Sequence, residues 1–167
     1  MLFRSNAVLA TLRRELQDLT VFQFDLNKVK SVKMVGWKAK AGQNLTRVME
    51  RTGARAWTMK EPPDFALDSN QLEIFVAGLA NLRAERFVAR AGGPKPEHKL
   101  GPQDPTFRIE ITVEGEKEPL TLTVGGLDAK EKAYYAESTS LKGAVFLLPQ
   151  ERFEKVLDDP TYFSKKS

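Results

Sequence analysis

Hydrophobic and polar residues alternate most clearly in the second half of the chain. In "FRIEITVE" (107–114) every second residue is apolar, and "PLTLTV" (119–124) repeats the pattern. A period of two places successive side chains on opposite faces of a β-strand. The polar segment "GEKE" between the two runs has the composition of a hairpin loop. We therefore predict an antiparallel pair with one buried face and one solvent-facing face.

The first half carries weaker strand patterns. "KVKSVKMVGWKAK" (28–40) is apolar in one phase and then changes phase, which predicts a bulge or twist near Val35 and Gly36. The preceding "TVFQFDLN" (20–27) fits either a connector or a short edge strand.

A second pair of strands is predicted before the first prolines. "LTRVMER" (45–51) and "ARAWTM" (54–59) flank Thr52-Gly53, where we expect a hairpin turn in which Gly53 supplies a positive φ. "EPPD" (61–64) ends this set, because neither proline can donate a hydrogen bond to a strand ladder.

The clearest helical pattern covers residues 69–88. Asp68 is the expected N-cap, and Gln71 follows at the spacing of a capping box. Apolar side chains recur at i, i+3, i+4 and i+7: Leu72, Phe75, Val76, Leu79, Leu82 and Phe87. Such a stripe is typical of a helix face that packs on a core. Gly78 lowers helix propensity, and on a helix that covers a sheet it permits close approach.

Two further strands and two further helices complete the prediction. The strands are "AYYAES" (133–138) and "GAVFLL" (143–148). A last helix, "QERFEKVL" (150–157), begins after Pro149, a residue suited to a helix start, and a short helix is predicted at 7–18.

The order of elements predicts an α+β fold with mainly antiparallel sheet and covering helices. Residues 1–89 form one strand-and-helix half and residues 106–167 a second, joined by a connector at 90–105. The halves resemble each other weakly, and they are also consistent with one continuous domain.

The connector "RAGGPKPEHKLGPQDP" contains His98, which is the only histidine of the chain. Its neighbours are proline, lysine and glutamate, the composition of a solvated loop. We therefore interpret His98 as a surface residue without a catalytic role, and expect His98→Ala to leave folding unchanged.

Composition excludes several chemistries. The chain has 167 residues and no cysteine, which removes disulfides, thiolate metal sites and cysteine nucleophiles. No apolar run reaches the length of a membrane span, and the first residues lack the features of a secretory signal. One histidine cannot form a multi-histidine metal site, so neither a metal nor a cofactor is expected.

Neither the acidic residues nor the glycines form a recognisable catalytic or binding motif. Glu114, Glu116 and Glu118 lie in a predicted hairpin, where solvated charge explains them. The pairs Gly92-Gly93 and Gly125-Gly126 match neither a dinucleotide-binding nor a phosphate-binding pattern, and we interpret "VGGLD" as a strand end and turn. No catalytic residue is predicted.

Charge is distributed unevenly along the chain. Residues 1–60 carry 12 Lys and Arg against 4 Asp and Glu, whereas residues 101–167 carry 9 against 12. The basic side chains lie near two tryptophans, as in some single-strand binders, and also fit the wet face of an edge hairpin. The candidate polyanion-binding residues are Lys28, Lys30, Lys33, Lys38, Lys40, Arg47 and Arg51.

Several motifs together resemble a known family. They are "LQDLTVFQFDLNKVKSVKM", "ARAWTM", "ALDSNQLEIFVAGLANLRAERFV", "HKLGPQDPTFRIEITV", "LTLTVGGL", "YYAES" and "AVFLLPQERFEKVL". Over residues 18–163 the chain resembles the uncharacterised bacterial domain-of-unknown-function family numbered 4340. The resemblance implies a link to the bacterial envelope, commonly in longer chains with a membrane anchor and several such modules. It carries over no catalytic residue.

Residues and resemblance together favour a non-enzymatic structural or protein-interaction module with a protein partner. The alternative is a polyanion- or nucleic-acid-binding module that uses the basic first third. A hydrolase with an unrecognised carboxylate site is the third hypothesis, and a deep pocket with converging carboxylates would favour it.

Overall fold

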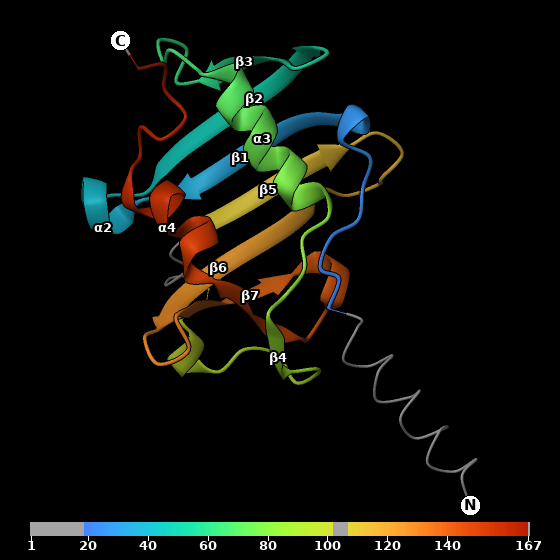
Figure 1. Cartoon of the computed structure of the whole chain (residues 1–167), viewed down its shortest axis with the longest axis vertical. Helices are drawn as coiled ribbons and strands as arrows, with labels where there is room; N and C mark the ends of the chain where they lie inside the picture. Colours follow the sequence, from blue (N-terminus) through green and yellow to red (C-terminus); the bar gives the residue numbers. More distant parts are fainter. Residues whose placement is uncertain (1–18, 102–106, 167) are drawn as a thin grey trace, which may run out of the picture.

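The chain folds as one eight-stranded antiparallel sheet with helices against one of its faces (Figure 1). A computed structural model describes residues 19–101 and 107–166, and the helix predicted at 7–18 lies outside them. The strand order is β3-β2-β1-β5-β6-β7-β8-β4. The predicted α+β class with a mainly antiparallel sheet is confirmed.

The strands are β1 (Val29–Gly36), β2 (Leu45–Gly53), β3 (Ala56–Glu61), β4 (Arg86–Ala89), β5 (Phe107–Val113), β6 (Leu120–Asp128), β7 (Ala133–Ser138) and β8 (Val145–Pro149). The helices are α2 (Lys38–Ala41), α3 (Ser69–Ala80) and α4 (Gln150–Asp158), with 3-10 turns η1 (Leu26–Lys28), η2 (Pro96–His98) and η3 (Thr139–Leu141).

Pairings between the first and second parts of the chain build this sheet. β1 pairs with β5, with Val32 opposite Ile111, and β4 pairs with β8, with Phe87 opposite Phe146. All four side chains belong to the main core or pack against it. Residues on both sides of the predicted connector therefore contribute to a continuous sheet.

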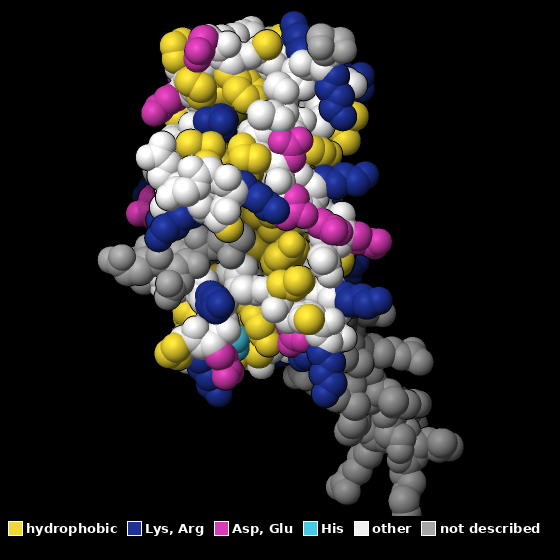
Figure 2. All heavy atoms as spheres, turned by 90° about the vertical axis from the view of Figure 1, so that its left-hand side faces the viewer, with side chains coloured by type: hydrophobic (Ala, Val, Ile, Leu, Met, Phe, Trp, Pro, Cys, Tyr) yellow, Lys and Arg dark blue, Asp and Glu magenta, His cyan; other side chains and the backbone are white. Residues whose placement is uncertain are grey.

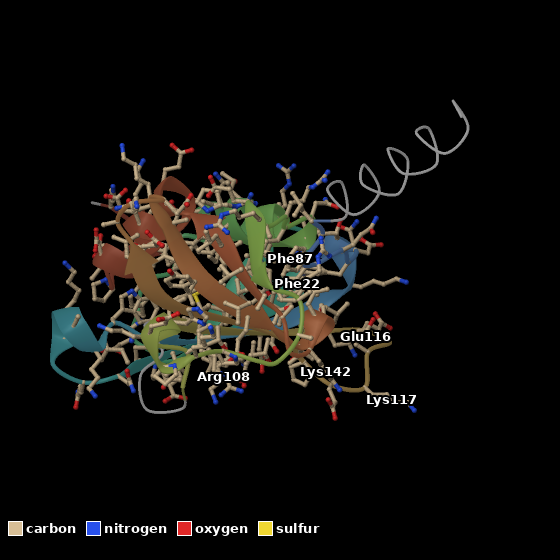
Figure 3. All side chains as sticks on the ribbon, turned by 90° about the horizontal axis from the view of Figure 1, so that it is seen from below. Phe22, Phe87, Arg108, Glu116, Lys117 and Lys142 are labelled. Carbon is tan, nitrogen blue, oxygen red and sulfur yellow. The ribbon has the colours of Figure 1, made fainter. Side chains whose placement is uncertain are left out.

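The predicted alternation of β5 is confirmed. Its four apolar side chains, Phe107, Ile109, Ile111 and Val113, are buried under the helices. Arg108 between them is exposed on the opposite face, the outer face of the sheet. Figure 3 shows Arg108 and Lys142 on the side of the sheet away from α3 and α4.

Helix α3 begins as predicted but ends earlier. The Asp68 carboxylate accepts a hydrogen bond from the Gln71 backbone N–H at 3.1 Å, which confirms the N-cap. The helix stops at Ala80, so the prediction of a helix to residue 88 is wrong. Residues 86–89 instead form strand β4, because they pair with β8. Phe87 lies opposite Phe146 in this pairing and packs edge-on against it, with ring centroids 6.3 Å apart.

Helix α4 agrees with its prediction and is anchored at the sheet end. Phe153, Val156 and Leu157 are buried. The indole N–H of Trp37 donates a hydrogen bond to the Val156 carbonyl at 2.7 Å. The Trp37 ring packs edge-on against the Phe107 ring, with ring centroids 4.9 Å apart. Trp37 therefore connects the end of β1 to the covering helix.

The irregularity predicted in the first strand lies elsewhere. β1 ends at Gly36, and Trp37 adopts a left-handed conformation with φ of 64° before the short helix α2. The register shift of the β1–β5 pair falls between Val29 and Ser31, not at Val35. The change of phase after Val35 thus marks the end of the strand, because the turn, not a bulge, redirects Trp37 into the core.

The hairpin of β2 and β3 is confirmed, but its turn differs in detail. The left-handed residue is Arg55, with φ of 57°, whereas Gly53 remains in β2 opposite Ala56. The role predicted for Gly53 is therefore wrong. Segment 20–27 is mainly a connector, with a single bridge from Thr20 to Arg83 and the turn η1.

The segment before residue 102 lies against the outer face of the sheet. Its residues His98 and Leu100 are buried, with 3% and 4% of their surface exposed. They cover Gly125 of β6. "VGGLD" is the end of this strand, as predicted, but it contains no turn, because β6 continues to Asp128. The described hydrophobic residues that are buried but outside the main core cluster are Ala80, Leu100, Ala133, Ala144, Val145 and Leu147.

Candidate functional site

The structure separates the predicted polyanion-binding residues. Arg51 points to the helix-covered face, where its guanidinium pairs with Glu73 of α3 at 3.0 Å, and their side chains are 10% and 11% exposed. Glu73 also accepts a hydrogen bond from the Trp57 indole N–H at 2.6 Å. Arg51 therefore fastens α3 to the β2–β3 hairpin and is withdrawn from any surface for polyanions.

Arg47 is also engaged inside the fold. Its guanidinium lies over the rings of Trp37 and Phe65, at 5.6 Å and 5.1 Å from their centroids. Burial lowers the pKa of Arg47 from its usual value. The side chain thus contributes cation–π contacts to the core edge.

The lysines of the basic stretch remain exposed but occupy different parts of the surface. Lys33 on β1 lies 4.0 Å from Glu110, and Lys40 on α2 lies 3.6 Å from Asp158. Lys28, Lys30 and Lys38 are exposed at the ends of η1, β1 and α2. Binding of a polyanion by these lysines stays a prediction.

His98 is buried, so its interpretation as a solvated surface residue is wrong. The imidazole stacks on Tyr135 of β7 with ring centroids 4.6 Å apart, and Nδ1 accepts a hydrogen bond from the Lys95 N–H at 3.0 Å. Nε2 lies 3.7 Å from a Glu97 carboxylate oxygen. Figure 2 shows only a small cyan area of this side chain. Sequence composition missed the burial because the contacts come from strands that lie distant in the chain.

The contacts of His98 continue to the end of β6. The Tyr135 hydroxyl donates to Asp128 at 2.8 Å, and Asp128 also accepts the N–H groups of Lys130 and Glu131. The Glu131 N–H and the Tyr135 hydroxyl lower the pKa of Asp128, and the same hydrogen bond raises the pKa of Tyr135. These bonds fix the ring on which the imidazole rests.

A polar cleft of about 480 Å³ lies on the outer face beside Leu100. Thr121, Thr123, Glu137 and Arg108 line it from three neighbouring strands. Burial raises the pKa of Glu137, while the positive charge of Arg108 acts in the opposite direction. Glu137 is the one carboxylate among the described lining residues, so the converging carboxylates that a hydrolase would need do not meet in this cleft.

A second hollow, of about 540 Å³, lies between α3, α4 and the C-terminal residues, and we refer to it as the α3–α4 groove. Ile74, Phe75 and Tyr162 form its apolar surface, and Arg152, Lys155 and Lys166 are its cationic residues. Ile74 is 65% exposed, the most exposed large hydrophobic side chain that the structure describes. An exposed apolar side chain in a hollow with polar edges is typical of an interaction site.

Aromatic packing and a hydrogen bond from a side chain to the backbone fix the walls of the groove. Phe75 contacts Phe153 of α4 and Phe163 of the C-terminal segment, with centroids 6.3 Å and 5.3 Å apart. The side-chain amide of Gln71 donates a hydrogen bond to the Tyr162 carbonyl at 2.6 Å, which connects the C-terminal segment to α3. The elements on both sides of the groove are therefore packed against one another, so the groove has a fixed shape.

Sequence reasoning did not find this groove. The apolar stripe of α3 identifies the buried residues, whereas Ile74 lies two positions from Leu72 on the polar side. The isoleucine on the polar side of this amphipathic helix is the one feature of the sequence that indicates an exposed apolar site here. The partners Arg152, Tyr162 and Lys166 come from a segment that is far away in the sequence.

The fold and the groove define an α+β domain whose antiparallel sheet carries covering helices on one face. The chain belongs to the family described as Domain of unknown function (DUF4340), whose model matches residues 57–167. The predicted membership is confirmed, although the match begins at Trp57 and not at residue 18. No curated protein and no solved structure matches the chain. None of the helices within 19–101 and 107–166 combines the length and hydrophobicity of a bilayer-spanning segment.

Proposed function

We propose that the protein is a non-enzymatic interaction module that binds another protein through the α3–α4 groove, as part of a bacterial envelope assembly. The observation that carries this proposal is the exposure of Ile74, 65%, inside a groove with apolar surface from Phe75 and Tyr162. Removing such side chains from water supplies the main free energy of association between proteins.

The rigidity of the groove supports the proposal. Because Phe75 is packed between Phe153 and Phe163, a partner that docks here loses little free energy to reorganisation of this protein. The envelope context comes from the family resemblance alone.

The two predicted strand-and-helix halves act as one binding unit in this proposal. The groove draws α3 from the first part of the chain and α4 from the second, and the β1–β5 pairing joins the strands of both parts in the one sheet beneath them. Neither part alone supplies both walls of the groove.

A photo-crosslinking amino acid at position 74 tests the proposal. The full chain carrying p-benzoylphenylalanine in place of Ile74 is irradiated in a bacterial lysate, and adducts are identified by mass spectrometry. The matched control carries the same residue in place of Leu127, a 44% exposed side chain on β6 outside the groove. We expect a discrete protein adduct at position 74 that position 127 does not give. Equal or absent adducts at both positions contradict the proposal.

A further inference from the structure

Charged residues of helix α4 line two different hollows according to their sign. Arg152 and Lys155 are three residues apart and line the α3–α4 groove. Glu151 and Glu154, also three apart, line a different hollow together with Glu85. Residues three apart on a helix are neighbours, so each pair acts together in its own hollow, although Glu151, four residues before Lys155, is also a neighbour of Lys155 on the helix surface.

The groove therefore has a positive electrostatic character. Lys166 of the C-terminal segment adds a third cation to Arg152 and Lys155. Asp68 is the one carboxylate among the described lining residues, and one of its oxygens already accepts the Gln71 N–H as the helix cap. Arg152 also donates to the Gly78 carbonyl of α3 at 2.5 Å, which keeps its guanidinium over the groove.

Figure 2 views the side of the molecule on which α2 and α4 lie in Figure 1, and it shows hydrophobic side chains with Lys and Arg side chains beside them. In the groove the same combination is made by Ile74 and Phe75 with Lys155. An apolar centre with charged edges is the usual composition of a specific interface, in which the centre gives affinity and the edges select the partner.

We propose that the α3–α4 groove binds an acidic segment of a partner protein. An aliphatic or aromatic side chain of that segment packs on Ile74 and Phe75, while its carboxylates face Arg152, Lys155 and Lys166. This inference rests on the proposed function and adds the chemistry of the partner. Charge complementarity distinguishes it from a neutral or basic segment, which the three cations would repel or leave unpaired.

A displayed library of random peptides is the probe. The library is selected on the full chain and, in parallel, on the Lys155→Glu/Lys166→Glu variant. The matched control is Lys132→Glu, a charge reversal of an exposed lysine in the turn before β7, which lines the hollow of Glu151 and Glu154 and not the groove. Circular dichroism and thermal unfolding check that all variants keep the fold. We expect the wild type to enrich peptides that combine Asp or Glu with Leu, Ile or Phe.

The affinity of the most enriched peptide, measured by fluorescence anisotropy, gives the quantitative test. Reversing Lys155 and Lys166 should weaken binding by about tenfold or more, because two attractive exposed pairs become repulsive. Binding to the Lys132→Glu control should change by less than about twofold, and binding to the wild type should weaken as salt is raised.

The outcomes separate this inference from the function on which it rests. Enrichment of neutral or basic peptides, or equal affinity for the wild type and the double reversal, overturns the acidic partner. If position 74 still crosslinks to a protein in those cases, the interaction module stands without this chemistry. Failure of both the crosslinking and the peptide selection contradicts both.

Discussion

The backbone of His98 lies directly against the Cα of Gly125 in β6. A Cβ at Gly125 would overlap the His98 carbonyl oxygen and would lie 2.9 Å from the Lys99 carbonyl oxygen and 2.8 Å from Cδ2 of Leu100. The glycine thus allows a proline-rich segment to pack on the outer face of the sheet. This contact explains why a histidine in a polar stretch is buried.

Gly125→Ala should therefore destabilise the protein by about 1–3 kcal/mol, the usual cost of an added methyl in tight packing. The cost arises because two of the three obstructing atoms belong to backbone carbonyls, which cannot move aside without undocking η2. Urea unfolding followed by fluorescence measures the change.

Gly126→Ala is the matched control for this substitution. A Cβ there would meet its neighbours at 3.6–3.7 Å, which is ordinary van der Waals contact. We expect its effect to stay below about 1 kcal/mol. Equal losses for the two alanine variants would contradict the packing of His98 and Leu100 on Gly125.

His98→Ala should lower the free energy of unfolding by about 1–3 kcal/mol. The substitution removes the ring that stacks on Tyr135 and leaves the Lys95 N–H without its acceptor. The sequence alone predicted that His98→Ala would leave folding unchanged, because it placed the histidine in solvent, but the side chain is buried. Glu97→Ala is the control, because the Glu97 side chain is 72% exposed, and its loss should cost less than about 0.5 kcal/mol. A His98→Ala protein as stable as the wild type would refute the buried role.

The elements that could be predicted are those whose signal is local. The alternation in β5 and the cap of α3 at Asp68 depend on neighbouring residues only, and both are confirmed. The end of α3 could not be predicted, because Leu82 and Phe87 fit a helical stripe and a strand equally well. Pairing of Phe87 with Phe146, 59 residues later, decides in favour of the strand.

The candidate site was less predictable than the fold. A list of lysines and arginines predicts a basic surface, but it does not show that Arg51 has a buried carboxylate partner on α3. The groove at Ile74 likewise depends on residues that arrive from the end of the chain. In both cases tertiary contacts, which a local pattern does not contain, determine whether a charge or an apolar side chain faces solvent.

Loss of the buried ion pair between α3 and β2 should be costly. Glu73→Ala leaves the Arg51 guanidinium and the Trp57 N–H without their shared acceptor, and we expect a loss of about 3–5 kcal/mol. Glu73→Gln keeps an acceptor for Trp57 and should lose less. Thermal and urea unfolding give both values.

A surface pair provides the control for that prediction. Lys60 and Glu50 lie 3.4 Å apart with both side chains 51% exposed, so Glu50→Ala should cost less than about 1 kcal/mol. A Glu73→Ala variant within that range would show that the Arg51–Glu73 pair contributes no more than an exposed one.

Two carboxylates should give opposite dependences of stability on pH. Burial raises the pKa of Glu137, so the folded state holds this proton more tightly than the unfolded state does. The stability that this proton contributes is lost as pH rises from the ordinary glutamate pKa, about 4.3, through the raised value. Glu137→Gln should therefore gain stability relative to the wild type as pH increases from about 4 to 7.

Asp128 should behave in the reverse sense. Hydrogen bonds from the Glu131 N–H and the Tyr135 hydroxyl lower its pKa, so its contribution is present above the ordinary aspartate pKa, about 3.9, and is lost as pH falls through the lowered value. Asp128→Asn should be less stable than the wild type at neutral pH, and the difference should shrink in acid. Urea unfolding of both variants at several pH values measures the slopes. Slopes of the same sign would contradict the assignment, because burial opposes ionisation of Glu137 whereas hydrogen bonding favours ionisation of Asp128.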